Sequence, residues 1–93
     1  MERFTKKDGG IFIVPADSIQ NVPGGHGGEA VERLAVFESV LEHLAEQQIK
    51  IAEQLEILRD EGKTNSVKFK ELLGQKMLNT NTLALFEVYG IKF

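Results

Sequence analysis

Two histidines are the side chains of this sequence with the widest chemical range, because an imidazole can transfer protons near neutral pH or bind a metal ion. His26 lies in a glycine-rich stretch, and His43 precedes Glu46 by three residues on a predicted helix. Such a pair can contribute to a metal site, but di-metal helical bundles use several of these motifs and this chain has one. A solvated histidine beside a surface glutamate is the better interpretation, so we expect no metal site.

Nucleophilic catalysis and phosphate binding need residue patterns that this sequence lacks. There is no cysteine, and Ser18, Ser39 and Ser66 have no base at an interpretable spacing. Residues 24–28 include four glycines but match neither the dinucleotide-binding nor the P-loop spacing. The Gly-Lys-Thr triplet at residues 62–64 resembles the end of a P-loop, yet it follows a helix rather than a strand. We therefore expect no enzyme, no catalytic residues and no cofactor.

Composition predicts one small soluble protein. The chain has 93 residues, of which 42% are hydrophobic, and no apolar run approaches the length of ~20 residues that spans a bilayer. The first residues lack the apolar segment of a signal peptide, and the absence of cysteine suits a reducing compartment, so we expect the cytoplasm. A single core of this size is marginally stabilising, which favours association into oligomers.

Charge is distributed unevenly along the chain, although the net charge is only −3. Residues 29–61 carry nine acidic and three basic groups, whereas residues 62–93 carry two acidic and five basic groups. An acidic helix disfavours nucleic acid as a partner. The basic C-terminal third has only Phe69 among its lysines, which falls short of a nucleic-acid-binding footprint.

The N-terminal residues 1–28 are predicted to form a β-hairpin followed by a glycine-rich linker. Residues 3–14 favour a hairpin with Asp8-Gly9 as its two-residue turn. From residue 16 to residue 28 the chain is loop-like, and the glycines of residues 24–28 give the backbone high freedom. Whether these glycines form a hinge or become ordered on binding is open from the sequence.

Residues 30–61 contain the one long, strict hydrophobic repeat, and this repeat predicts a helix about 48 Å long. Its residues alternate in steps of three and four, as in a coiled coil, and Gln48 is the one polar member. Gln48 is either a polar layer that sets the register or a tolerated edge position. We call these residues the helix seam and predict that they form an interface in a homodimer or higher oligomer: Leu34, Phe37, Leu41, Leu44, Gln48, Ile51, Leu55 and Leu58.

Two shorter helices are predicted after the long one. Gly62 is placed to end the long helix in a left-handed conformation. A second helix follows, with an apolar stripe at helical spacing: Phe69, Leu72, Leu73 and Met77. Residues 79–82 are expected to break that helix and to cap a third, short one. The predicted fold is mainly α: an N-terminal β-hairpin, a long central amphipathic helix and two shorter C-terminal helices. The helical domain, residues 29–93, would form an oligomeric helical bundle.

A row of glutamates runs along the long helix at i, i+4 spacing. We call these glutamates the acidic row: Glu38, Glu42 and Glu46. Neighbouring members repel each other by about 0.2–0.5 kcal/mol per pair. The row either solubilises an outer face or binds a basic surface. That basic surface could belong to the chain's own C-terminal lysines or to a protein partner.

Three segments carry a resemblance to known proteins: Glu2-Arg3-Phe4-Thr5, residues 28–35 and residues 61–73. With them the chain resembles small phage and prophage proteins of Firmicutes whose activity is uncharacterised. The resemblance implies a phage genome in a Gram-positive host and no catalytic residue. In that setting small binders commonly act on host machinery, and some inhibit immune nucleases.

The leading expectation is therefore a phage accessory protein that acts by protein–protein binding and inhibits a host defence system, in the manner of an anti-CRISPR protein. One alternative is a self-assembling structural or scaffolding component of the phage. A second alternative is a small nucleic-acid-binding regulator that uses the basic C-terminal third.

Overall fold

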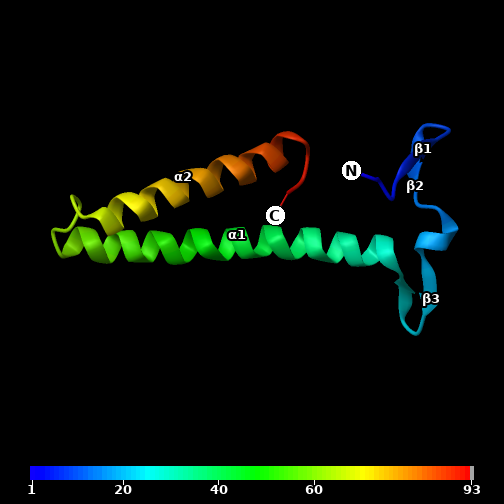
Figure 1. The fold of residues 1–93 in the computed structure, drawn as a ribbon, viewed down its shortest axis with the longest axis horizontal. Coiled ribbons are helices and arrows are strands. Elements are labelled where there is room, and N and C mark those ends of the chain that lie inside the picture. The colour runs from blue at the N-terminus through cyan, green and yellow to red at the C-terminus, as the bar shows by residue number, and fades with distance from the viewer. Residues whose placement is uncertain (93) are drawn as a thin grey trace. The chain divides into compact units, whose positions relative to one another are not determined.

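The structure, a computed structural model, describes residues 1–92 and consists of two helices and two small β-hairpins (Figure 1). The longer helix, α1 (Glu29–Asp60), is one continuous element of 32 residues. The chain divides into two units, Met1–Ser39 and a second unit that begins at Val40. Each unit is described by itself below.

The first hairpin pairs β1 (Lys6–Asp8) with β2 (Ile11–Ile13) in antiparallel register. Its turn is Gly9-Gly10, with φ angles of 58° and 89°. The prediction of an Asp8-Gly9 turn is therefore wrong. A two-residue turn of this type needs positive φ at both central positions, and two adjacent glycines satisfy that need better than an aspartate and a glycine.

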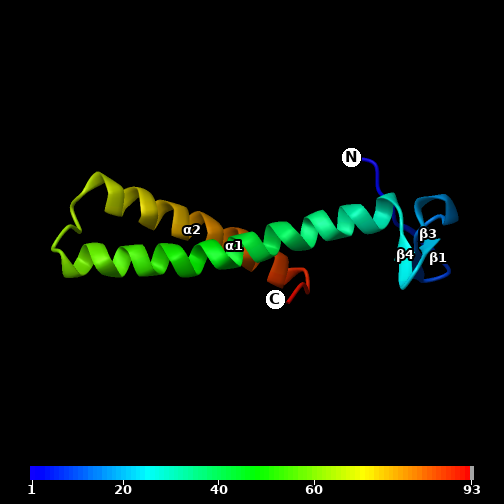
Figure 2. The same cartoon turned by 90° about the horizontal axis from the view of Figure 1, so that it is seen from below.

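A second hairpin occupies the segment in which the sequence predicted a loop. After a short 3₁₀ turn, η1 (Ala16–Ser18), strand β3 (Gln20–Val22) pairs antiparallel with β4 (Gly25–Gly27), as labelled in Figure 2. The fold prediction is thus wrong in giving one hairpin instead of two. Glycine content alone favoured a loop, because strand preference reflects side-chain packing and β4 offers almost none.

Gly28 connects the second hairpin to α1 in a conformation that only glycine adopts readily. Its φ is +109°, and a Cβ placed there would lie 2.5 Å from the backbone oxygen of Ser18. A side chain would therefore meet both backbone strain and a steric clash with backbone atoms that cannot rotate away. Gly28 is fixed by this close approach to η1.

Arg33 holds the N-terminal residues against the first turns of α1. Its guanidinium lies over the ring of Phe4, 4.0 Å from the centroid, and its Nη1 donates to the backbone oxygen of Glu2 at 2.7 Å. Cation–π contacts and hydrogen bonds at exposed sites each contribute about 1 kcal/mol. No side chain among residues 1–39 is fully buried, so these polar contacts and the close backbone packing carry the order of this unit.

Gly62 ends α1, as predicted, and allows the chain to turn back. Its φ is +70°, and its amide donates to the carbonyl of Arg59 at 3.0 Å, while the Lys63 amide donates to the carbonyl of Leu58 at 2.8 Å. This pair of bonds is the Schellman arrangement, which satisfies the last carbonyls of a helix. The second helix, α2 (Val67–Val88), begins at Ser66, whose hydroxyl accepts from the Phe69 amide at 3.1 Å.

Helix α2 is continuous, so the predicted third helix does not exist as a separate element. Residues 79–82 do not break it, because the side chains of three of them form hydrogen bonds within the helix. Thr80 and Thr82 donate to the carbonyls four residues earlier, at 2.8 and 2.9 Å, and Asn79 accepts from Gln75 at 2.8 Å. The prediction of three helices in a bundle is therefore wrong: the structure has two helices and two hairpins.

The core of the second unit lies between α1 and α2, where α2 runs back along the C-terminal part of α1 (Figure 1). Ile51 and Leu55 from α1 pack against Phe69 from α2, and Leu55 is only 1% exposed. Leu58 and Leu72 pack against this cluster. The apolar spacing of α1 thus creates a helical hairpin within one chain.

Candidate protein-binding surfaces

The helix seam has different surroundings along α1. Leu41, Ile51 and Leu55 are buried, whereas Leu34 is 55% exposed. Half-buried members are Phe37, Leu44, Gln48 and Leu58. Because Ile51 and Leu55 pack against the chain's own α2, a second copy could reach them only by displacing α2. The interface that we predicted along the seam stays a prediction, and the structure gives part of it an intrachain role.

Gln48 links the two helices of the hairpin. Its Nε2 donates to Thr80 Oγ1 at 2.9 Å and to the backbone oxygen of Lys76 at 3.2 Å. Its Oε1 is buried and has no hydrogen-bond partner within the described chain. Hydrogen bonds from a side chain in one helix to a specific turn of another fix their relative register. The polar position in the seam therefore aligns α1 with α2 of the same chain.

The acidic row lies on the exposed surface of α1, and more acidic residues continue it. No basic side chain in residues 1–92 forms an ion pair with Glu38, Glu42 or Glu46. The alternative that the chain's own lysines neutralise the row therefore has no support from ion pairs in this part of the chain. From Glu46, further steps of three and four along α1 reach Ile49 and then three more acidic residues. These residues are Glu53, Glu56 and Asp60.

Sequence reasoning missed this extension, because only the i, i+4 glutamates were considered. Of the added residues, Glu56 forms an exposed ion pair with Arg59 at 3.5 Å. Exposed pairs of this kind contribute about 0–1 kcal/mol, so Glu56 remains available to another partner. The outer side of α1 presents negative charge from Glu38 to its last turn.

Helix α2 exposes several apolar residues among polar ones, and this exposure was also missed. Sequence reasoning placed Leu73 and Met77 in one stripe with Phe69 and Leu72, but Met77 is 60% exposed and Phe69 is buried. The available signal was the pairing of adjacent apolar residues, as in Met77-Leu78, which widens a stripe beyond one face. The exposed apolar residues of α2 are Val67, Leu73, Met77, Leu78, Leu85 and Val88.

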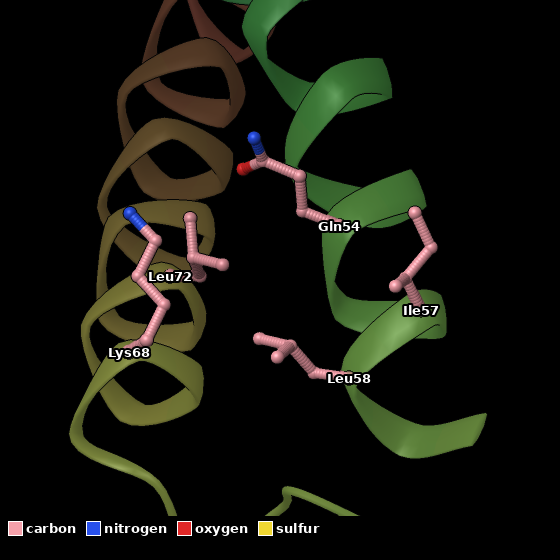
Figure 3. A pocket seen from close by; sticks show the side chains of 5 residues that line it. All are labelled: Gln54, Ile57, Leu58, Lys68 and Leu72. Carbon is pink, nitrogen blue, oxygen red and sulfur yellow. The ribbon is translucent and has the colours of Figure 1, made fainter. Parts of the chain in front are cut away.

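One small pocket lies between the helices near their closed end (Figure 3). Gln54, Ile57 and Leu58 line it from α1, and Lys68 and Leu72 line it from α2. Its volume is about 180 Å³, whereas pockets for small molecules commonly measure about 300–1,000 Å³. The pocket is therefore smaller than a typical small-molecule site.

The histidines lie apart from other metal-binding groups. His26 is exposed in β4 and His43 is exposed on α1. Among the described residues, no group of three or more histidine, cysteine, aspartate or glutamate side chains could hold a metal ion. The His43 and Glu46 pair thus has no further ligand from the described part of this chain.

Phe69, the aromatic residue that lies among the lysines of the C-terminal third in the sequence, is buried. Phe69 is 8% exposed, and the Arg59 guanidinium lies 5.6 Å from its ring centroid. Nucleic acid binding to single strands commonly uses exposed aromatic rings on which bases stack. Because Phe69 is buried, it is not available as a stacking platform.

A neighbouring lysine is paired with a carboxylate. A hydrogen bond from Lys63 to Glu61 at 2.8 Å, together with the charge of Glu61, raises the pKa of Lys63 above its usual 10.5.

Comparison with protein families, curated proteins and solved structures finds no match to this chain. Neither helix of the described chain is long and apolar enough to cross a membrane. The residues themselves must carry the argument for function.

Proposed function

We propose that this chain is a phage accessory protein that acts by binding other proteins in the cytoplasm of a Gram-positive host. The observation that carries the proposal is the exposed acidic row, Glu38, Glu42 and Glu46, continued along the same side of α1. The resemblance to small phage and prophage proteins supplies the setting.

The acidic side of α1 suits a partner with a basic surface. Glutamates held in a line on one helix create a negative potential that speeds association with a positively charged protein. A protein that binds nucleic acid presents such a positive surface. The row would then compete with nucleic acid for that surface, which is how a small acidic protein could inhibit a nuclease of a host defence system such as a CRISPR effector.

A scaffolding role is the second candidate, and the exposed apolar residues of α2 favour it. Contiguous apolar surface on a small protein commonly marks a site of association. In this role self-assembly would be the whole function. Growth of the particle mass with concentration in light scattering, beyond a closed oligomer, would support it.

Reversal of charge in the acidic row tests the proposed function. Glu38, Glu42 and Glu46 changed together to lysine should abolish capture of a basic host protein by the tagged chain. The helix should remain folded, because lysines at i, i+4 repel one another about as much as glutamates do. Affinity capture from host lysate, with quantitative mass spectrometry, measures the loss, which we expect to be at least about tenfold.

The matched control changes three other exposed acidic residues, Glu2, Asp17 and Glu71, to lysine. The net charge changes equally, so a general charge effect would reduce capture in both variants. Loss in the acidic-row variant alone supports the proposal. Equal recovery of the host protein by the wild-type chain and the acidic-row variant would contradict it.

A further inference from the structure

The middle of α2 consists of residues that form helices poorly. Asparagine and threonine rank among the weaker helix formers, and they fill all four positions from Asn79 to Thr82. Even so, α2 runs without interruption from Val67 to Val88. The bonds of Thr80 and Thr82 to carbonyls four residues earlier accommodate the hydroxyls but do not add helix stability. Contacts with α1 must therefore supply part of the stability of this segment.

The contacts that this segment makes with α1 are polar. We call the side chains that make them the polar layer: Gln47, Gln48, Asn79 and Thr80. Asn79 is 2% exposed, and its Nδ2 donates to Gln47 Oε1 at the long distance of 3.5 Å. Gln48 donates to Thr80 Oγ1, while its own Oε1 is buried without a hydrogen-bond partner in the described chain. A buried acceptor of this kind is destabilising until water reaches it, so hydration of Gln48 favours opening of the layer.

Apolar burial differs on the two sides of the polar layer. Toward the loop that joins the helices, Phe69 of α2 is buried and Leu72 packs against the same core. Beyond the layer, no side chain of residues 80–88 in the described chain is buried, and Leu83 and Phe86 are half-buried. The ribbons of α1 and α2 also separate toward the C-terminal end of α2 in Figure 1. Because segments with few buried apolar side chains open most readily, the C-terminal half of α2 is the less firmly held half.

We propose that residues 83–88 of α2 form a strap that detaches from α1 as one unit, with residues 79–82 as its hinge, while residues 67–78 stay docked. Three independent features coincide at the hinge: weak helix propensity, a buried acceptor without a partner and the end of the apolar core. The proposal goes beyond the proposed function and does not depend on the acidic row or on any host protein.

Leu41 is the buried side chain of α1 that detachment of the strap uncovers. It lies seven residues before Gln48, about two helical turns, so both side chains share the face of α1 that turns toward α2. On α2, Leu83 and Phe86 follow Asn79 by four and seven residues and share its face. Leu41 is 5% exposed while the strap is closed. The strap thus controls access to an apolar part of the helix seam.

Amide hydrogen exchange of the purified wild-type chain, followed by NMR, tests the strap without any substitution. The amides of residues 83–88 should share one protection factor, at least about tenfold lower than that of residues 71–78. A shared value indicates opening as a unit, whereas fraying lowers protection residue by residue toward the end. Equal protection along α2, or a gradual fall from residue 71 to residue 88, would overturn the proposal.

Gln48→Leu tests the role of the polar layer. The substitution removes the unpartnered acceptor, and Thr80 keeps its bond to the Lys76 carbonyl at 2.8 Å. Exchange of the strap amides should slow by at least about tenfold, because opening no longer hydrates a buried acceptor. Faster exchange would mean that Gln48 holds the strap closed, and unchanged exchange would mean that it has no part in opening. Either result would overturn the proposal.

Gln54→Leu is the matched control, because it makes the same change at an exposed position of α1 beside the docked part of α2 (Figure 3). Exchange of the strap amides should be the same as in the wild-type chain, since residues 67–78 take no part in the opening. Equal slowing by Gln48→Leu and Gln54→Leu would contradict a local strap, because the whole hairpin would then open together.

A cysteine at position 41 reports detachment directly, because the sequence has no other cysteine. Labelling of Leu41→Cys by a maleimide should slow by at least about tenfold when Gln48→Leu is added, since both substitutions act on the same opening. Equal labelling rates with and without Gln48→Leu would overturn the claim that the strap covers Leu41. Failure of host-protein capture leaves these measurements unaffected, because they use the purified chain alone.

Discussion

Leu55→Ala is expected to lower the free energy of unfolding of the helical hairpin by about 3 kcal/mol. Leu55 is the most buried side chain of the core, at 1% exposure, and packs with Ile51 and Phe69. Its truncation removes apolar burial and leaves a cavity that two rigid helices fill only in part. With so small a core, this loss is a large share of the total stability.

Urea denaturation followed by circular dichroism measures this change, at one fixed protein concentration because association adds to apparent stability. Ile57→Ala is the matched control, since Ile57 lies two residues away on α1 and is 56% exposed. We expect that control to change the free energy of unfolding by less than about 1 kcal/mol. Equal effects of the two substitutions would mean that α2 does not cover α1 as described.

Gly28→Ala is expected to unfold the second hairpin while leaving α2 intact. The new Cβ would lie 2.5 Å from the Ser18 oxygen, and φ of +109° is strained for alanine. Strain of this kind alone costs about 1–3 kcal/mol, and an isolated hairpin is only marginally stable. Backbone NMR chemical shifts of residues 16–28 should therefore move to random-coil positions.

Gly25→Ala is the control for this prediction. Gly25 lies in the same segment, but a Cβ added there meets nothing within 4 Å and its φ is not positive. Its chemical shifts outside the substitution should remain those of the folded hairpin. Random-coil shifts in both variants would show that glycine content, rather than the close approach at Gly28, governs this segment.

The long helix was predictable because its signal is repeated many times. Alternating steps of three and four over residues 30–61 leave only a helix as the solution, and Gly62 marks its end through a requirement for positive φ. What such a repeat cannot identify is the chain that covers it. An apolar stripe is satisfied equally by a symmetry mate and by the next helix of the same chain.

The errors arose where local preference and tertiary contacts disagree. Asn79, Thr80 and Thr82 favour caps in isolation, but in α2 their side chains bond within the helix and Thr80 also receives a bond from Gln48. The second hairpin depends on Gly28 fitting against Ser18, a contact between residues ten positions apart that no pattern reveals. Short strands without apolar alternation give no periodic signal.

The candidate surfaces were predicted unevenly for the same reason. The acidic row was visible as spacing on a single helix, and exposure on α1 agrees with that placement. The exposure of apolar residues on α2 was not recognised, because assigning a stripe to a core requires knowing where the neighbouring helix lies. Met77 and Leu72 look alike in a sequence and differ only once α1 is in place.

The most direct test of this account asks whether the seam of α1 is covered by α2 of the same chain. Gln48 Nε2 donates to Thr80 Oγ1 at 2.9 Å, so the two positions face each other across the helical hairpin. The Gln48→Cys/Thr80→Cys protein, treated with a short bis-maleimide cross-linker, should run as a single chain on a denaturing gel, with the cross-link assigned by peptide mapping. Cross-linked dimers as the main product would contradict the account, because α2 would then cover the α1 seam of another copy.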